Sequence, residues 1–132
     1  MPKDPLFLTL AEVLRIQAYQ IERFGGEPGL RDSGLLESAI AQPQASYGGR
    51  FLHGDLYEMA AIYAFHICKN HPFLDGNKRT ALATALVFLE VNGISLLDSS
   101  GGLAGAMEEI ASSRLDKSGL ARLFRQLPRE GR

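Results

Sequence analysis

The chain has 132 residues, with 14 basic and 15 acidic side chains and a single cysteine. This length suits one domain, predicted over residues 1–132, and the balanced charge gives no overall positive field that would attract nucleic acid. Cys68 alone allows no internal disulfide and is typical of a reducing compartment, so we expect a cytoplasmic protein. No apolar run approaches the roughly 20 residues that span a bilayer, so we expect no membrane partner.

The first two predicted elements are helices with recognisable starts. Thr9 followed by Glu12 forms a capping-box pattern, and apolar residues then recur at helical spacing until Gly25 stops the pattern. Asp32 or Ser33 begins a second, shorter helix, because short polar side chains accept the unpaired N–H groups of a first helical turn.

A break separates the second helix from the third. Pro43 ends the second helix because proline lacks a backbone N–H donor. The glycine-bearing segment 44–54 shows no helical period, so we expect a loop or a short hairpin there. Asp55 and Glu58 then mark the start of a third helix, whose apolar stripe should face the core and which delivers His71 at its far end.

The second half of the chain is predicted to be helical as well. Residues 81–89 are almost wholly apolar, as in a central helix surrounded by others, and Asn92 and Gly93 end them. Weaker helical patterns follow around 103–112 and 117–127. Strand-like alternation is nearly absent, so the predicted fold class is all-α with at most one small hairpin.

The most informative segment lies between the two central helices and spans residues 71–80. It reads His-Pro-Phe-Leu-Asp-Gly-Asn-Lys-Arg-Thr, which combines a titratable base, a carboxylate, a glycine turn and two cations. Gly76 permits a tight turn, and Asn77 opens the next helix, where unpaired N–H groups and the helix dipole attract an anion. The segment therefore predicts a phosphate site.

Each side chain of this segment has a candidate role. His71 titrates near neutrality and is the candidate general base for a hydroxyl that attacks phosphate. Asp75 is the candidate magnesium ligand, because Mg²⁺ uses one or two carboxylates together with phosphate oxygens. Lys78 and Arg79 lie in a first helical turn, where the dipole disfavours cations, so an anionic ligand would explain them. Phe73 is expected to anchor the loop in the core.

Purely structural roles remain the alternative for each of these residues. Taken singly, a histidine at a helix end bonds the last carbonyl groups more often than it acts as a base, and an aspartate more often forms a turn. It is the combination of residues within one short segment that favours a functional site.

The same segment resembles the signature of the Fic/Doc superfamily, His-x-Phe-x-Asp/Glu-Gly/Ala-Asn-Gly/Lys-Arg, and Lys78 points to its Doc (death-on-curing) branch. The resemblance also includes Phe24-Gly25-Gly26 and Gly29-Leu30-Arg31-Asp32. It covers residues 8–97, whereas 98–132 is weakly diagnostic. It implies a compact domain of about six helices, with the signature loop between two central helices and a small β-hairpin flap nearby.

The resemblance also implies a role for each signature residue. In Fic proteins the matched histidine deprotonates a target hydroxyl, the acidic residue binds magnesium, and the glycine, asparagine and arginine hold the phosphates of a nucleotide, here ATP. The implied catalytic residues are His71, Asp75, Asn77, Lys78 and Arg79. The implied nucleotide-binding residues are Gly76, Asn77, Lys78 and Arg79, and the implied ligand of Mg²⁺ is Asp75.

Two departures from AMP-transferring Fic enzymes bear on the activity. Those enzymes usually have glycine at the position of Lys78 and a second arginine at that of Leu82. Doc proteins share the lysine and are similar to kinases that phosphorylate elongation factor Tu and so block translation. The resemblance implies a toxin of this kind, neutralised by a cognate Phd-like antitoxin whose disordered tail folds onto it. AMP transfer and a non-catalytic antitoxin-binding module are the alternatives.

Overall fold

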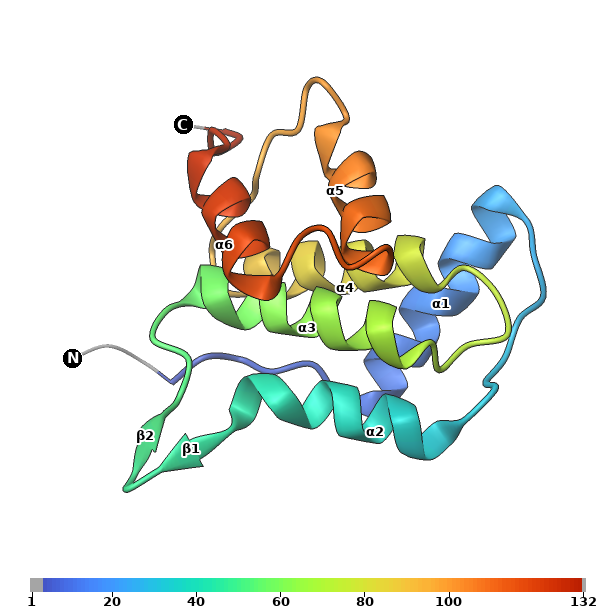
Figure 1. Ribbon diagram of the computed structural model, residues 1–132, viewed down its shortest axis with the longest axis horizontal. Helices are drawn as coiled ribbons and strands as arrows, with labels where there is room; N and C mark the ends of the chain where they lie inside the picture. Colours follow the sequence, from blue (N-terminus) through green and yellow to red (C-terminus); the bar gives the residue numbers. More distant parts are fainter. Residues whose placement is uncertain (1–3, 132) are drawn as a thin grey trace.

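The computed structural model describes residues 4–131, so residues 1–3 and 132 of the predicted domain lie outside the described part. Six α-helices follow one another along residues 4–131, together with one 3-10 turn and one antiparallel hairpin (Figure 1). The helices are α1 (Leu10–Phe24), α2 (Ser33–Ala41), α3 (Leu56–Asn70), α4 (Asn77–Val91), α5 (Gly102–Ala111) and α6 (Lys117–Gln126). The 3-10 turn is η1 (Gln42–Gln44), and the strands are β1 (Ser46–Tyr47) and β2 (Arg50–Phe51). The predicted all-α class with a small hairpin is confirmed.

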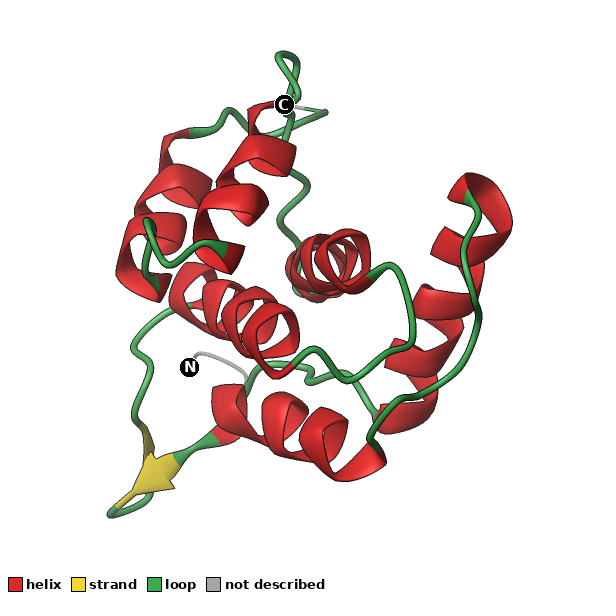
Figure 2. Ribbon diagram, turned by 45° about the vertical axis from the view of Figure 1, so that its right-hand side comes forward, coloured by secondary structure: helices red, strands yellow, loops and turns green. Residues whose placement is uncertain are grey.

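Helices α3 and α4 form the centre of the molecule and lie along each other (Figure 1). α3 also packs against α2, α5 and α6, whereas α4 packs against α1 and α5. The apolar segment 81–89 lies at the centre of the molecule, as predicted. α3 nevertheless contacts more helices than α4 does, and every side chain from Met59 to Ala64 is buried. The hairpin projects away from the helices (Figure 2). No helix within residues 4–131 is long and apolar enough to cross a bilayer.

The buried side chains form one cluster to which all six helices contribute. Its largest members include Tyr63, Phe73, Phe88 and Phe124. The hydroxyl of Tyr63 accepts a hydrogen bond from the N–H of Leu8 at 2.9 Å, and burial raises the pKa of Tyr63 to about 12. Phe73 comes from the loop between α3 and α4 rather than from a helix, and it is fully buried. The expectation that Phe73 anchors this loop is confirmed.

Most of the helices begin at a side-chain oxygen that bonds their first N–H groups. Such oxygens belong to Thr9, Asp32, Asp55, Asp98 and Asp116. The predicted capping box of Thr9 and Glu12 is present in full. Among the α-helices of residues 4–131, only α4 begins without any side-chain partner, after Gly76. A helix start of this kind leaves N–H groups available for a ligand.

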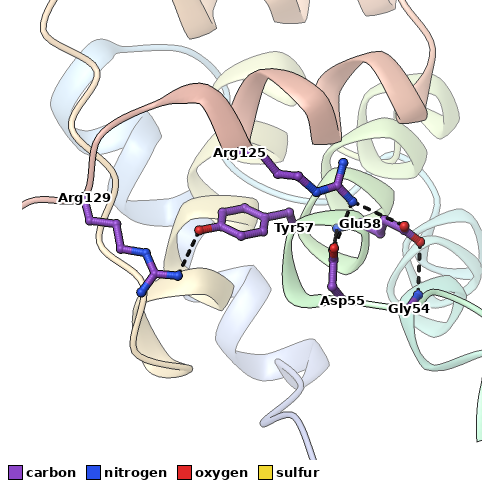
Figure 3. A network of polar contacts seen from close by, with 6 residues as sticks. All are labelled: Gly54, Asp55, Tyr57, Glu58, Arg125 and Arg129. Carbon is purple, nitrogen blue, oxygen red and sulfur yellow. Dashed lines mark hydrogen bonds and ion pairs between the residues drawn. The ribbon is translucent and has the colours of Figure 1, made fainter.

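A polar network joins α6 to the start of α3 (Figure 3). Arg125 Nη2 lies 2.9 Å from Asp55 Oδ2 and 3.3 Å from Glu58 Oε2. The other carboxylate oxygen of Glu58 accepts the N–H of Gly54 at 3.0 Å, just after the hairpin. Ion pairs at this exposure contribute up to about 1 kcal/mol each, so the network aligns these segments more than it stabilises the whole fold.

His66 of α3 makes the stability of the fold depend on pH. Its ring is partly buried, and Nε2 has no hydrogen-bond partner in the described part of the chain. Burial lowers the pKa of His66 below its ordinary value of 6.5, and the positive charges of Lys117 and His53 lower it further. The folded state therefore prefers the neutral ring. This preference stabilises the fold fully above pH 6.5 and is lost as the pH falls through the folded-state pKa.

We predict that the free energy of unfolding, measured by urea denaturation, decreases as the pH is lowered from about 7.5 to about 5. The variant His66→Leu should show a smaller decrease over the same range, because leucine binds no proton. An identical decrease in the variant and the natural chain would assign this pH dependence to other groups.

Candidate active site

A cleft of about 580 Å³ opens where the loop between α3 and α4 faces α5. The predicted site residues all line it, together with side chains of α3, α4 and α5. The cleft is lined by Cys68, His71, Leu74, Asp75, Gly76, Asn77, Lys78, Arg79, Leu82, Ala104, Met107, Glu108 and Ala111. The structure therefore brings the predicted catalytic, nucleotide-binding and metal-binding residues to one cavity.

The loop is held in place by backbone pairing with an earlier segment of the chain. Leu30 and Phe73 form an isolated antiparallel β-bridge, and the N–H of Leu74 donates to the carbonyl oxygen of Gly29 at 3.0 Å. This pairing gives backbone groups of the non-helical loop their hydrogen-bond partners. The resemblance grouped residues 29–32 with the signature, and the structure shows their direct contact.

His71 ends α3 in a left-handed backbone conformation, with φ 54° and ψ 54°. Its N–H still donates to the carbonyl oxygen of Ile67 at 3.1 Å, while its side chain is exposed at the cleft. For a residue other than glycine this conformation costs about 1–2 kcal/mol, whereas glycine adopts it freely. Backbone strain of this size at a cleft residue points to a functional reason for the histidine.

The side chain of Asn77 stabilises the loop by bonding both backbone polar groups of Phe73. It is buried, its Oδ1 accepts the N–H of Phe73 at 2.9 Å, and its Nδ2 donates to the carbonyl oxygen of Phe73 at 3.0 Å. Because both polar ends of the amide are occupied, the part of Asn77 that remains available for a ligand is its backbone N–H.

The first turn of α4 presents free N–H groups to the cleft. Gly76 precedes it with φ 71°, and no bonded acceptor occurs in residues 4–131 for the N–H groups of residues 77–79. These groups carry the positive end of the helix dipole. An anion in the cleft would therefore meet several aligned donors at once, which is the arrangement that binds phosphate groups at helix starts.

The two cations of this turn already have protein partners. Lys78 Nζ lies 3.0 Å from Glu108 Oε1 of α5, on the other side of the cleft. The guanidinium of Arg79 donates to the carbonyl oxygens of Phe24 at 3.3 Å and Gly25 at 3.0 Å, and it lies over the Phe24 ring. These contacts give both cations a structural role, since Arg79 also completes the end of α1, and the expected anionic ligand beside them stays a prediction.

Asp75 has one carboxylate oxygen engaged by the fold. Its Oδ2 accepts the N–H of Glu27 at 3.1 Å, and its backbone carbonyl accepts Gln17 Nε2 at 3.3 Å. Gly26 lies so close that an added Cβ would be 3.2 Å from Asp75 Cβ and Cγ. No group of three or more metal-ligating side chains occurs in the part of the chain described. A single carboxylate beside a helix start that would bind phosphate nevertheless fits Mg²⁺, which takes its remaining ligands from phosphate and water.

Three residues that support the site were not predicted from the sequence: Gln17, Glu27 and Glu108. The sequence contained a usable signal for Gln17, because its spacing places it on the same face of α1 as the apolar residues Val13 and Ile21. The structure shows that this face is buried and that Gln17 is only 3% exposed. A polar side chain in such a position needs a buried partner. Glu27 acts through its backbone N–H, and Glu108 reaches the cleft only through the packing of α5, so neither is marked by a local pattern.

The fold and the signature loop define a helical domain of the Fic/DOC family, and the chain belongs to this family, whose model matches residues 7–89. Among characterised proteins, the chain is 40% identical over 103 residues to "Toxin Doc" of Mycolicibacterium smegmatis, which covers 74% of this chain and 77% of that protein. It is 36% identical over 116 residues to "Protein kinase doc" of Escherichia phage P1, which covers 88% of this chain and 90% of that protein. The predicted family and its Doc branch are thus confirmed.

We predict that Asn77→Ala lowers the free energy of unfolding by about 2–3 kcal/mol, because it leaves the N–H and the C=O of Phe73 buried without partners. Asn77→Asp should be at least as harmful, since a carboxylate oxygen would face the carbonyl oxygen of Phe73. Urea denaturation measures both values. A loss below about 0.5 kcal/mol in both variants would show that the paired hydrogen bonds contribute little.

A glycine in place of His71 should stabilise the protein. We expect His71→Gly to raise the free energy of unfolding by about 1 kcal/mol, because glycine relieves the left-handed backbone. His71→Ala is the matched control, since it removes the imidazole but keeps the strain. Thermal and urea denaturation should therefore rank the glycine variant above the alanine variant, and the reverse order would contradict the strain at this position.

Proposed function

We propose that this protein is a Doc-type toxin, which transfers the γ-phosphoryl group of a nucleoside triphosphate to a hydroxyl group of a protein. One observation carries the proposal: the uncapped start of α4 opens into a cleft that also contains His71 and Asp75. This arrangement places anion-binding donors, a base and a carboxylate around one volume. Phosphoryl transfer depends mainly on positioning and on neutralising charge, which these groups supply.

The nucleotide phosphates would be bound by the first turn of α4. The free N–H groups of residues 77–79 and the dipole of the helix favour negative charge there. Lys78 contributes a further cation once phosphate replaces Glu108 as its partner, because its Nζ is held by a single, half-exposed ion pair.

His71 would act as the general base. The oxygen of the attacking hydroxyl forms a bond to the γ-phosphorus, and its proton passes to a ring nitrogen of His71. The bond between the γ-phosphorus and the bridging oxygen breaks, and a nucleoside diphosphate leaves. The exposed position of His71 at the cleft supports this role, because a protein substrate has to reach the ring.

Asp75 would hold Mg²⁺ against the phosphates. When bound, the metal ion supplies positive charge that offsets the charge developing on the phosphate oxygens. The position of Asp75 supports this role, because one carboxylate oxygen is engaged by the N–H of Glu27 while the side chain is exposed at the cleft.

Transfer of phosphate is preferred over transfer of AMP for two reasons. Lys78 and Leu82 replace the glycine and the second arginine that AMP-transferring Fic enzymes usually carry, and both line the cleft. A relative that covers most of the chain bears the name protein kinase. We further propose that the protein substrate is elongation factor Tu and that its phosphorylation blocks translation. We also propose that the protein acts in the cytoplasm and is inhibited there by a Phd-like antitoxin. These proposals follow the resemblance and agree with a relative named as a toxin.

A labelling experiment tests the reaction and separates the two kinds of transfer. Purified protein is incubated with Mg²⁺, elongation factor Tu and ATP that carries the label at either the γ- or the α-phosphate. We predict incorporation of the γ-label alone, and His71→Ala should lower its rate by about 100-fold or more. Incorporation of the α-label would establish AMP transfer instead.

The variant His66→Leu serves as the matched control, because it alters a histidine of the same helix that does not line the cleft. It should label elongation factor Tu at the rate of the natural chain. If neither label is incorporated although the antitoxin still binds, the domain is a binding module and the catalytic proposal fails.

A further inference from the structure

Arg31 does not line the cleft, yet it contacts the backbone of the loop that carries His71. Its Nε donates a hydrogen bond to the carbonyl oxygen of His71 at 2.8 Å, and its Nη2 donates to that of Asn70 at 3.1 Å. The backbone N–H groups of Arg31 and Asp32 both donate to the carbonyl oxygen of Pro72, at 2.7 and 3.0 Å. Three consecutive carbonyl groups, those of residues 70–72 where α3 passes into the loop, thus accept hydrogen bonds from one short segment.

The end of α3 needs such donors from outside the helix. The last carbonyl groups of a helix have no partners within it, and a left-handed residue at the end is usually followed by an N–H that bonds back to the final turn. Here the residue after His71 is Pro72, which has no N–H. The guanidinium of Arg31 provides donors to the carbonyl oxygens of Asn70 and His71, which have no backbone donor within residues 4–131.

The orientation of His71 depends on these backbone contacts. No hydrogen bond within residues 4–131 holds its imidazole, and its side chain is exposed. Its left-handed conformation is unfavourable for a histidine, so the loop would relax if the surrounding contacts were removed. Arg31 is itself exposed, so its loss removes little buried surface and affects the loop more than the core.

We propose that Arg31 is a positioning residue, which holds His71 in the left-handed conformation that presents the imidazole to the cleft. The catalytic consequence rests on the phosphoryl transfer proposed above. The structural part does not, because the conformation of the loop can be followed in the absence of any reaction.

Steady-state kinetics test the catalytic consequence with Arg31→Gln, Arg31→Lys and a control. We expect kcat to fall about 10- to 100-fold in both variants, while KM for ATP changes by less than about 2-fold, because the base is displaced but the helix start is not. Lysine should not rescue the rate, since it keeps the charge but lacks two donors in fixed geometry. Arg129→Gln, which removes an exposed arginine bonded to the hydroxyl of Tyr57, should retain the natural kcat.

Amide hydrogen exchange tests the structural part without a substrate. The N–H groups of Phe73 and Leu74 should exchange about 10-fold faster in Arg31→Gln and in Arg31→Lys, and at the natural rate in Arg129→Gln. If Arg31→Gln fails to fold, the steady-state kinetics and the amide exchange are both measured on Arg31→Lys alone.

The outcomes separate this inference from the proposed function. Unchanged exchange at the loop overturns the role of Arg31, whatever happens to kcat. Faster exchange with an unchanged kcat overturns it as well, because the loop would then not need this anchor for the reaction. If the natural chain transfers no phosphate at all, the proposed function fails, and the exchange rates alone decide whether Arg31 fixes the loop.

Discussion

The structure depends on the hydrogen bonds that keep residues 71–76 out of helical geometry between the two central helices. A non-helical segment at the centre of a helical domain is stable only if its N–H and C=O groups find partners. Residues 29–32 provide these partners on one side, and the side chain of Asn77 provides them on the other. Phe73 then fixes the segment in the core, so the polar residues beside it stay at the cleft.

The same segment carries two features that lower stability. α4 starts without the side-chain cap that the other helices have, and α3 ends at a left-handed histidine where glycine would fit better. Each feature costs on the order of 1 kcal/mol. Both occur at the cleft, where a cap would occupy the N–H groups of residues 77–79 and a glycine would remove the imidazole. Stability is thus lower at the point where the proposed function needs a bound anion and a base.

Local patterns in the sequence were enough for the helices and for the candidate loop. Thr9, Asp32 and Asp55 mark helix starts because capping acts within a few residues, and residues 71–80 contain the whole signature. The supporting contacts were not predictable in this way. Glu108 and the backbone of Glu27 meet the loop only after distant segments pack together, and Arg79 binds the end of α1 rather than serving the cleft alone. Such contacts depend on tertiary packing, which a single sequence does not reveal.

The place of α5 in the chain sets the order in which the cleft is completed during synthesis. Glu108 faces Lys78 from a position 30 residues further along, so a growing chain contains the entire signature well before it contains the opposite wall. A product whose translation stops ahead of this helix has the loop but lacks the wall that Ala104, Met107, Glu108 and Ala111 form. The complete enclosure around the start of α4 therefore exists only after α5 has been synthesised.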